Sequence, residues 1–290
     1  MPSGQQHPAD LLLAAIDAAG APVCVGLDPV AERLPDEVRV GTVSTSLARF
    51  SLGIIDAVRG IVPCIKIQSA CFERYGPDGF KALEEVMAAA KSAGLITILD
   101  AKRGDIGISA EHYAASLFGH FAADWCTANA YLGMDGITPF LARGGVFALV
   151  RTSNPASDAL QSLPLQSGRT VAEAVASLVA GAGAESVGTC GFSSLGAVVG
   201  ATKAHDALAL RTAMPQQLFL VPGYGAQGGT ADDVRTCFRA DGKGAIITAS
   251  RSVIYPSAKP SEHWKTAVER ASRNFAAEIR SVVAPAAAHP

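Results

Sequence analysis

The sequence has few charged residues and no excess of either sign. Lysine and arginine total 24 and aspartate and glutamate total 26, which gives a net charge of −2 over 290 residues. This balance argues against a nucleic-acid-binding protein and against a basic membrane-binding face, because both concentrate positive charge. Charged residues make up only 17% of the chain and apolar residues 49%. The chain therefore has ample material for a core and no signature of disorder.

Aromatic residues are also few, at 6% of the chain. The apolar content comes mostly from Ala, Val, Leu and Ile, which suits buried parallel strands under helices better than an aromatic-rich sandwich. The length allows one large α/β barrel or two modest domains.

Targeting, membrane-spanning and metal-binding patterns are absent from the sequence. Residues 1–9 lack a basic region and the apolar run 11–16 ends at Asp17, so we expect no signal peptide. The longest uncharged stretch, 212–231, contains two prolines and four glycines and is no membrane span. The six cysteines are scattered without a C-x-x-C pair, and no His/Cys cluster has zinc spacing. We therefore expect reduced, mostly buried thiols in a cytoplasmic protein without a metal.

Short apolar runs alternate with longer helical patterns along the chain. The candidate strands are residues 23–27, 62–67, 95–99, 123–128, 145–150, 197–200, 218–221 and 244–248. The candidate helices are residues 43–59, 77–93, 108–119, 134–142, 168–183, 202–213, 230–239 and 261–283. This alternation indicates a parallel sheet covered by helices. Eight such units predict an α/β protein with a closed (β/α)8 TIM barrel, and an open doubly wound sheet is the alternative.

We expect residues 1–290 to form a single barrel domain, because no linker divides the chain. We expect segment 1–20 to be an N-terminal helix extension in which residues 9–19 close the barrel bottom, and the Ala/Pro-rich segment 283–290 to be a frayed tail. The polar loop 154–168 after the fifth strand is unusually long, which is typical of a functional element such as a lid. A Gly-Leu-Asp-Pro turn follows the first strand in place of G-x-G-x-x-G, which weakens a dinucleotide-binding interpretation.

Polar side chains follow at least six of the predicted strands. In a parallel barrel the carboxyl ends of the strands share one face, and that face holds the active site. Each side chain alone has an ordinary explanation, such as a turn residue for Asp28 or a snorkelling strand-end lysine for Lys66. Their convergence favours an active site. The residues are Asp28, Lys66, Gln68, Asp100, Lys102, Asp105, Asn129, Arg151, Ser153, Asn154, Gln227, Ser250 and Arg251.

The strongest local pattern is LDAKRGDI at residues 99–106. Alternation along a strand places Asp100 and Lys102 on the same side, at the barrel mouth, although a structural ion pair would show the same spacing. Asp105 lies where the next helix begins and would also suit an N-cap. A lysine flanked by carboxylates stays protonated and acts as a general acid, because nearby negative charge favours the ammonium ion. A carboxylate beside it repels an anionic substrate group, and this combination suits the formation and protonation of a carbanion.

A second pattern points to a phosphate. The phosphate sites of TIM barrels are commonly built by the loops after strands seven and eight. These loops carry the glycine-rich segment 223–229 and Arg251. Glycines let backbone N–H groups approach phosphate oxygens, and arginine binds them bidentately. The two loops predict a phosphorylated small-molecule ligand.

The segment LDAKRGDIG resembles the signature of the orotidine 5′-phosphate decarboxylase family. The segments VGLDP, IKIQSACFE, RTSNP and VPGYGAQGG, which occur in order between residues 23 and 254, are similar to the longer bacterial branch (type 2) of that family. The resemblance implies a (β/α)8 barrel that works as a homodimer with its active sites at the subunit interface. It also implies decarboxylation of orotidine 5′-phosphate to UMP in pyrimidine biosynthesis, without a metal or an organic cofactor.

The resemblance further implies four catalytic residues. Lys102 matches the donor of a proton to C6 of the pyrimidine, and Asp100 matches the carboxylate pressed against the substrate carboxylate. Asp105 matches an aspartate that the partner subunit contributes. Lys66 matches the lysine of the charged network.

Five substrate-binding residues follow from the same resemblance. Asp28 matches a ribose ligand, and Ser109 matches a hydroxyl residue that would also reach across the interface. Ser153 matches the serine that reads the pyrimidine amide. Gln227 and Arg251 match the phosphate-binding pair.

Two alternatives remain open from the sequence. The barrel group of 3-keto-gulonate-6-phosphate decarboxylase and hexulose-phosphate synthase shows a similar motif on strand three but binds magnesium through an acidic residue at the end of strand two. Lys66 takes that place here, and a cation beside a lysine is electrostatically poor. The other alternative is a non-catalytic barrel that binds a phosphate ligand, although such a module would need no proton donor.

Overall fold

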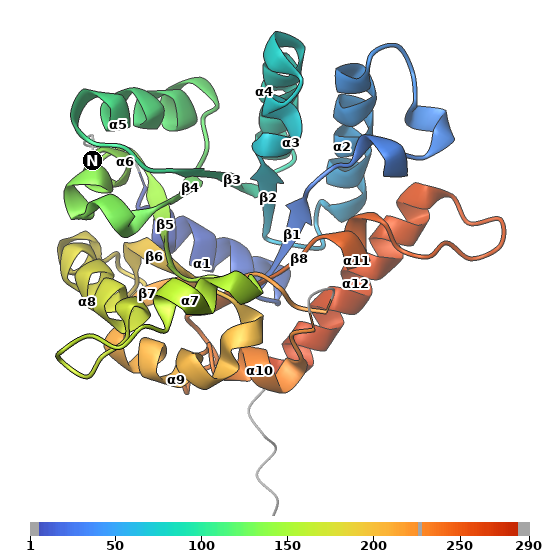
Figure 1. The fold of residues 1–290 in the computed structure, drawn as a ribbon. Coiled ribbons are helices and arrows are strands. Elements are labelled where there is room, and N and C mark those ends of the chain that lie inside the picture. The colour runs from blue at the N-terminus through green and yellow to red at the C-terminus, as the bar shows by residue number, and fades with distance from the viewer. Residues whose placement is uncertain (1–5, 226–227, 284–290) are drawn as a thin grey trace, which may run out of the picture.

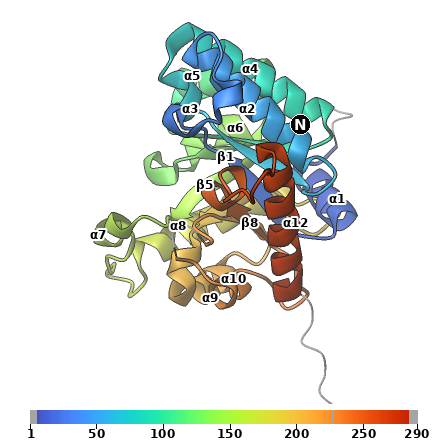
Figure 2. The ribbon, with the colours of Figure 1, turned by 90° about the vertical axis from the view of Figure 1, so that its right-hand side faces the viewer.

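The computed structural model describes residues 6–225 and 228–283, in which eight parallel strands close in sequence order into a barrel. Helices surround the strands on the outside (Figures 1 and 2). The prediction of a (β/α)8 barrel is confirmed, and the open sheet is wrong because β8 pairs with β1. The strands are β1 (Val23–Leu27), β2 (Cys64–Gln68), β3 (Ile96–Arg103), β4 (Trp125–Ala128), β5 (Gly145–Arg151), β6 (Ser193–Val199), β7 (Gln217–Val221) and β8 (Ala245–Ala249).

The α-helices of the described residues alternate with these strands. They are α1 (Pro8–Ala19), α2 (Val43–Val58), α3 (Ala70–Glu73), α4 (Gly76–Ser92), α5 (Gly107–Ala114), α6 (Thr138–Leu141), α7 (Asp158–Gln161), α8 (Val171–Gly183), α9 (Ala204–Ala213), α10 (Ala231–Arg235), α11 (Arg251–Ile254) and α12 (Trp264–Val283). Short 3-10 turns occupy Ala31–Arg33, Asp36–Val38, Ala130–Leu132, Met134–Gly136, Pro155–Ser157, Ala184–Ser186 and Ala201–Lys203, and a π-helical turn spans Ala115–His120.

Local sequence signals explain where several helices begin and end. Thr170 and Glu173 form a reciprocal capping box at the start of α8, which satisfies two otherwise free backbone N–H groups. Pro8 occupies the first turn of α1, where its missing N–H costs nothing. Gly20 ends that helix in the left-handed region with a φ of 68°, which glycine adopts without strain.

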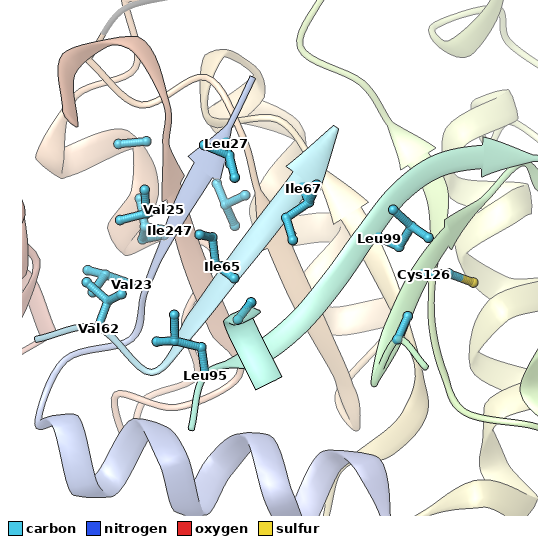
Figure 3. Close-up of a cluster of buried hydrophobic side chains, with 14 of the residues drawn as sticks. Val23, Val25, Leu27, Val62, Ile65, Ile67, Leu95, Leu99, Cys126 and Ile247 are labelled. Carbon is cyan, nitrogen blue, oxygen red and sulfur yellow. The ribbon is translucent and has the colours of Figure 1, made fainter. Parts of the chain in front are cut away.

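The core has two parts that lie on opposite sides of the strands. Outward-facing side chains such as Val25, Ile65 and Leu99 pack beneath the surrounding helices (Figure 3). A second cluster contains Trp125 and Phe147, whose rings stack with centroids 4.4 Å apart, together with Leu12 of α1. The α1 helix, in faint blue in Figure 3, lies beyond the starting ends of β1 and β2, as expected of a helix that closes the barrel bottom.

Some predicted bounds differ from the structure for identifiable reasons. Strand β6 begins at Ser193, four residues before the predicted start at 197. The apolar pattern misses this start because the strand opens with two buried serines. The hydroxyl of Ser193 donates to Gly183 O at 2.8 Å, so its polarity is satisfied inside the fold. The loop 154–168 contains α7, a helical turn that the sequence analysis did not predict.

Other expectations concern the ends of the chain and the cysteines. Apart from Val283, which ends α12, the predicted tail 283–290 lies outside the described residues. No helix in the described part of the chain combines the length and apolarity that a membrane span requires. The six cysteines are free, and four of them are buried.

Candidate active site

A cavity of about 490 Å³ opens at the carboxyl ends of the strands. This volume is in the range of small-molecule sites. All eight strands, or the loops that directly follow them, contribute side chains to its wall. The lining residues are Asp28, Lys66, Gln68, Asp100, Lys102, Thr127, Leu149, Thr152, Ser153, Asn154, Gln161, Val198, Leu220, Pro222, Gly223, Tyr224, Thr248, Ser250 and Arg251.

The carboxylate of Asp100 is the centre of the charged end of this cavity. Its Oδ2 accepts hydrogen bonds from Lys66 Nζ at 2.7 Å and from Gln68 Nε2 at 3.3 Å. Its Oδ1 accepts from Lys102 Nζ at 2.6 Å and from the hydroxyl of Thr127 at 2.8 Å. Four donors therefore fill the acceptor positions of one carboxylate, which fixes its orientation.

The charges around Asp100 keep it and its partner ionised. Burial alone would raise the pKa of Asp100, but the ammonium groups of Lys66 and Lys102 outweigh burial and hold that pKa well below its usual range. Burial alone would lower the pKa of Lys66, yet the negative charges of Asp100 and Asp28 raise it above its ordinary value. Asp28 completes this chain of charges with its Oδ1 3.5 Å from Lys66 Nζ. Two carboxylates and two ammonium groups thus alternate along one wall.

The backbone of β3 is irregular where it presents these groups. Leu99 pairs with Cys126 of β4 and Arg103 pairs with Ala128, so residues 100–102 lie opposite Thr127 alone. Lys102 has a φ of 46°, in the left-handed region, which costs a non-glycine residue about 1–3 kcal/mol. Asp100 and Lys102 both line the cavity, as predicted, but the irregular register means that simple strand alternation does not account for their placement. A bulge turns both side chains toward the cavity.

Asp105 and Ser109 lie apart from the cavity of their own chain. Both are partly exposed, and neither belongs to the described residues that line it. The possible role of Asp105 as an N-cap is wrong, since Ile106 holds that position in α5. Asp105 Oδ1 instead accepts from the backbone N–H of Ile106 at 2.9 Å.

Another part of the cavity wall is formed by the loops after β7 and β8. Gly223 and Tyr224 line it from the first loop, and Ser250 and Arg251 from the second. Gly223 has a φ of 97°, a conformation that favours glycine. A Cβ on Gly26 of β1 would lie 1.9 Å from Ser250 Oγ, so glycine is required for this close approach. The remaining predicted phosphate ligand, Gln227, lies outside the described residues.

A third wall is formed by the segment after β5. Thr152, Ser153 and Asn154 line the cavity, and α7 adds Gln161 to it. The side-chain Oε1 of Gln161 accepts a hydrogen bond from the backbone N–H of Thr152 at 2.9 Å. The side-chain Nε2 of Gln161 donates to the Thr152 hydroxyl at 3.0 Å. Gln161 therefore ties α7 to the strand end that carries Ser153.

Arg151, the last residue of β5, binds side chains within residues 157–162 of the segment that follows. Its guanidinium is 1% exposed and binds Asp206 of α9 through Nε at 2.6 Å and Asp158 of α7 through Nη2 at 2.5 Å. Lys203 also contacts Asp158 at 2.6 Å. Hydrogen bonds from Lys203 and Arg151 lower the pKa of Asp158 to about 2. These ion pairs tie α7 to the end of β5 and to residues 203–206.

Sequence reasoning left several of these side chains out of the predicted site. Gln68 and Arg151 stand at predicted strand ends without an expected role, and the sequence carries no prediction for Thr127 and Gln161. The signal for Gln68 was its place two residues after Lys66 on β2, whereas nothing in the local sequence marks Thr127. Asn129 is a turn residue, because its Oδ1 accepts from the backbone N–H of Tyr131 at 3.0 Å.

Acidic groups in the cavity are paired with lysines and do not cluster with one another. Within residues 6–225 and 228–283, no group of three or more His, Cys, Asp or Glu side chains is arranged to hold a metal ion. The end of β2 carries buried Lys66, so a divalent cation there would meet a positive charge.

Comparison with known proteins gives the same barrel and the same family. The model of the orotidine 5′-phosphate decarboxylase / HUMPS family matches residues 21–267. A Rhodopirellula baltica protein named orotidine 5′-phosphate decarboxylase is 41% identical, over 90% of this chain and 95% of its own. A protein of that name from Deinococcus radiodurans is 42% identical, over 80% and 84% of the two chains. The solved structure of Leishmania donovani OMP decarboxylase is similar with a TM-score of 0.81 and 31% identity, over 97% of this chain and all of that one.

The matched region runs from before β1 to beyond β8 and thus contains every strand that contributes to the cavity. With this coverage and with relatives above 40% identity, the chain belongs to the orotidine 5′-phosphate decarboxylase / HUMPS family.

Proposed function

We propose that this chain decarboxylates orotidine 5′-phosphate to UMP, a step of pyrimidine biosynthesis. The observation that carries the proposal is the ordered chain Lys66–Asp100–Lys102, with ion-pair distances of 2.7 and 2.6 Å, at one end of a closed-barrel cavity. Another part of the cavity wall carries Gly223 and Arg251, which suit a phosphate. The names of the relatives agree with this activity.

The charges account for the reaction. The carboxylate of Asp100 faces the substrate carboxylate, and the repulsion between them is relieved when the C6–carboxylate bond breaks and carbon dioxide leaves. The electron pair of that bond stays on C6. Lys102 then gives a proton to C6, which forms the C6–H bond of UMP and leaves a neutral amine that solvent reprotonates. Lys66 keeps Asp100 ionised throughout, because its ammonium group lies 2.7 Å away.

The remaining contacts orient the substrate. Asp28 binds the ribose hydroxyls, and Ser153 reads the amide edge of the pyrimidine. Arg251 binds the phosphate together with Gln227, although the structure does not describe Gln227. Because the phosphate is remote from C6, its binding energy serves orientation and transition-state stabilisation.

A second copy of the chain completes each site in this proposal. Asp105 and Ser109 do not line their own cavity, so they are free to reach the site of a partner. Large apolar side chains around them are exposed, including Ile108 at 64% and Tyr131 at 76%. Exposed apolar side chains gathered in this way are typical of an interface. The protein therefore works as a homodimer, with one domain in each chain.

The proposal includes a reaction without a metal or an organic cofactor, in the cytoplasm, on a small-molecule substrate and without a nucleic-acid or membrane partner. The magnesium-dependent phosphosugar reaction is less favoured, because Lys66 occupies the place of the metal ligand and is 5% exposed. A non-catalytic binding barrel is also less favoured. Binding alone would not require the strained backbone that aims Lys102 into the cavity.

The direct test follows the ultraviolet absorbance of orotidine 5′-phosphate with purified protein in EDTA. We expect substrate to be consumed and UMP to form in equal amounts without added metal. Absence of turnover, or turnover only after addition of Mg²⁺, would contradict the proposal.

A further inference from the structure

The hydroxyl of Thr127 joins the two groups that carry the proposed chemistry. Thr127 lies on β4, is 1% exposed, and lines the cavity beneath Asp100 and Lys102. Its Oγ1 lies 2.8 Å from Asp100 Oδ1 and 3.0 Å from the backbone nitrogen of Lys102. No role for this threonine follows from the resemblance or from the sequence.

The direction of both hydrogen bonds is fixed by chemistry. The backbone N–H of Lys102 can only donate, so the Thr127 oxygen accepts from it. The ionised carboxylate of Asp100 can only accept, so the single hydroxyl proton of Thr127 is donated to Oδ1. The two bonds use different parts of the hydroxyl and form together.

The position of Thr127 in the sheet explains why a side chain is needed there. Residues 100–102 of β3 lie opposite this one residue of β4, so regular ladder pairing fails between Leu99 and Arg103. The Thr127 hydroxyl supplies the hydrogen bond that the Lys102 N–H would otherwise lack. It thereby supports Lys102 in its left-handed conformation, with a φ of 46°.

We infer that Thr127 is a positioning residue that fixes the Asp100 carboxylate relative to the Lys102 backbone, so that Lys102 is placed to deliver its proton. This inference rests on the proposed function and assigns a role to a residue outside the Asp–Lys chain. When Lys102 gives its proton to C6, its side chain becomes a neutral amine, and the charged hydrogen bond from Lys102 to Asp100 Oδ1 is lost. The Thr127 hydroxyl then remains as the donor that keeps this oxygen in place.

The test compares Thr127→Val, which has nearly the same shape but no hydroxyl, with Thr127→Ser, which keeps the hydroxyl. We expect Thr127→Val to lower kcat about 10- to 100-fold, the effect of losing a hydrogen bond to a charged group, with little change in the dissociation constant of UMP. We expect Thr127→Ser to restore most of kcat. If the valine variant does not fold, Thr127→Ala carries the same expectation.

A second readout is independent of turnover. Loss of one donor to Asp100 raises the pKa of that carboxylate toward its ordinary value. We expect a carbon-13 NMR titration of the labelled carboxylate, assigned with Asp100→Asn, to show this rise in Thr127→Val but not in Thr127→Ser.

Thr97 offers a matched control at the other end of β3. Its buried hydroxyl also donates to a carboxylate, Asp124 Oδ2 at 2.8 Å, and accepts from a backbone N–H, that of Asp124 at 3.1 Å. Thr97→Val therefore removes the same two kinds of bond outside the cavity. We expect it to lower the melting temperature while kcat and the Asp100 titration stay unchanged.

The outcomes separate this inference from the proposed function. An inactive wild-type protein overturns the function, and the NMR titration still decides the role of Thr127 in setting Asp100. An active wild-type protein with unchanged kcat and unchanged titration in Thr127→Val overturns the inference alone. It is also overturned if Thr97→Val gives the same kinetic loss, or if Thr127→Ser is as impaired as Thr127→Val.

Discussion

At the scale of single residues, the site depends on keeping one buried carboxylate charged. Asp100 is 4% exposed, and such a group would normally be neutralised by burial. Two ammonium groups, one amide and one hydroxyl compensate it. Removing one partner of such an arrangement costs more than the pair contributes, because the other charge is left buried and unpaired.

This compensation makes stability depend on pH in a defined way. The folded pKa of Asp100 lies below the ordinary 3.8, so its contribution is present above that pH and is lost as the pH falls through the folded pKa. The folded pKa of Lys66 lies above the ordinary 10.5, so its contribution is present below that pH and is lost as the pH rises through the folded pKa. We therefore expect both contributions to be complete at neutral pH.

Urea denaturation of the Lys66→Met variant, from neutral pH into the acid range, checks this pH dependence of stability. We expect this variant to lose on the order of 3 kcal/mol of unfolding free energy at pH 7, because Asp100 then lacks its closest fully buried partner. The difference from wild type should shrink as Asp100 becomes protonated in acid. The exposed ion pair of Glu269 and Arg273 gives a control, since Glu269→Gln should cost less than about 1 kcal/mol. Equal losses in the two variants would contradict this description of the site.

At the scale of elements, the functional groups are placed by irregular segments within a regular barrel. The bulge in β3 turns Asp100 and Lys102 toward the cavity, and the α7 turn brings Gln161 to the end of β5. Regular elements follow from sequence periodicity, and the predicted strands fall on all eight observed ones. A bulge does not follow from periodicity, because its stabilising bond comes from Thr127 on a neighbouring strand.

The Arg151 ion pairs show the same limit of sequence reasoning. Arg151 and Asp206 are 55 positions apart, and the pairing of β5 with β6 brings the end of β5 next to the start of α9, which follows β6. Local sequence therefore indicated a long loop and suggested a lid. The structure shows in addition that α7 of this loop is tied to Arg151, whose side chain is 1% exposed, and the lid stays a prediction.

The role of this anchor can be tested with Arg151→Met. We expect faster amide hydrogen exchange over residues 152–162 and a decrease of roughly a hundredfold in kcat/KM, because a misplacement of about 1 Å in Ser153 or Gln161 is enough for such a loss. Arg169→Met changes an exposed arginine directly after this segment and should leave both quantities near wild type. Unchanged exchange in Arg151→Met would show that the segment is held by other contacts.

At the scale of the whole molecule, the proposed active site needs residues from two chains. Eight strand–helix units use almost the entire length, so one barrel per chain follows from the sequence and is seen in the structure. The near-neutral net charge does not indicate an anionic substrate. The cavity would bind such a substrate through a few lysine and arginine side chains that lie among aspartates. Asp105 was recognisable by its motif, but its distance from its own cavity appears only in three dimensions.

Subunit complementation tests the central claim, a charged site completed by the partner, most directly. Lys102→Ala and Asp105→Ala homodimers should each be nearly inactive on orotidine 5′-phosphate. After mixing and subunit exchange, each mixed dimer has one site with both residues intact and one with neither. At equal mixing half of the dimers are mixed, and each has one intact site of two. We therefore expect about a quarter of the activity of the same amount of wild-type protein, and no recovery when two Lys102→Ala preparations are mixed. Failure of the mixed sample to recover activity despite demonstrated subunit exchange would contradict the account.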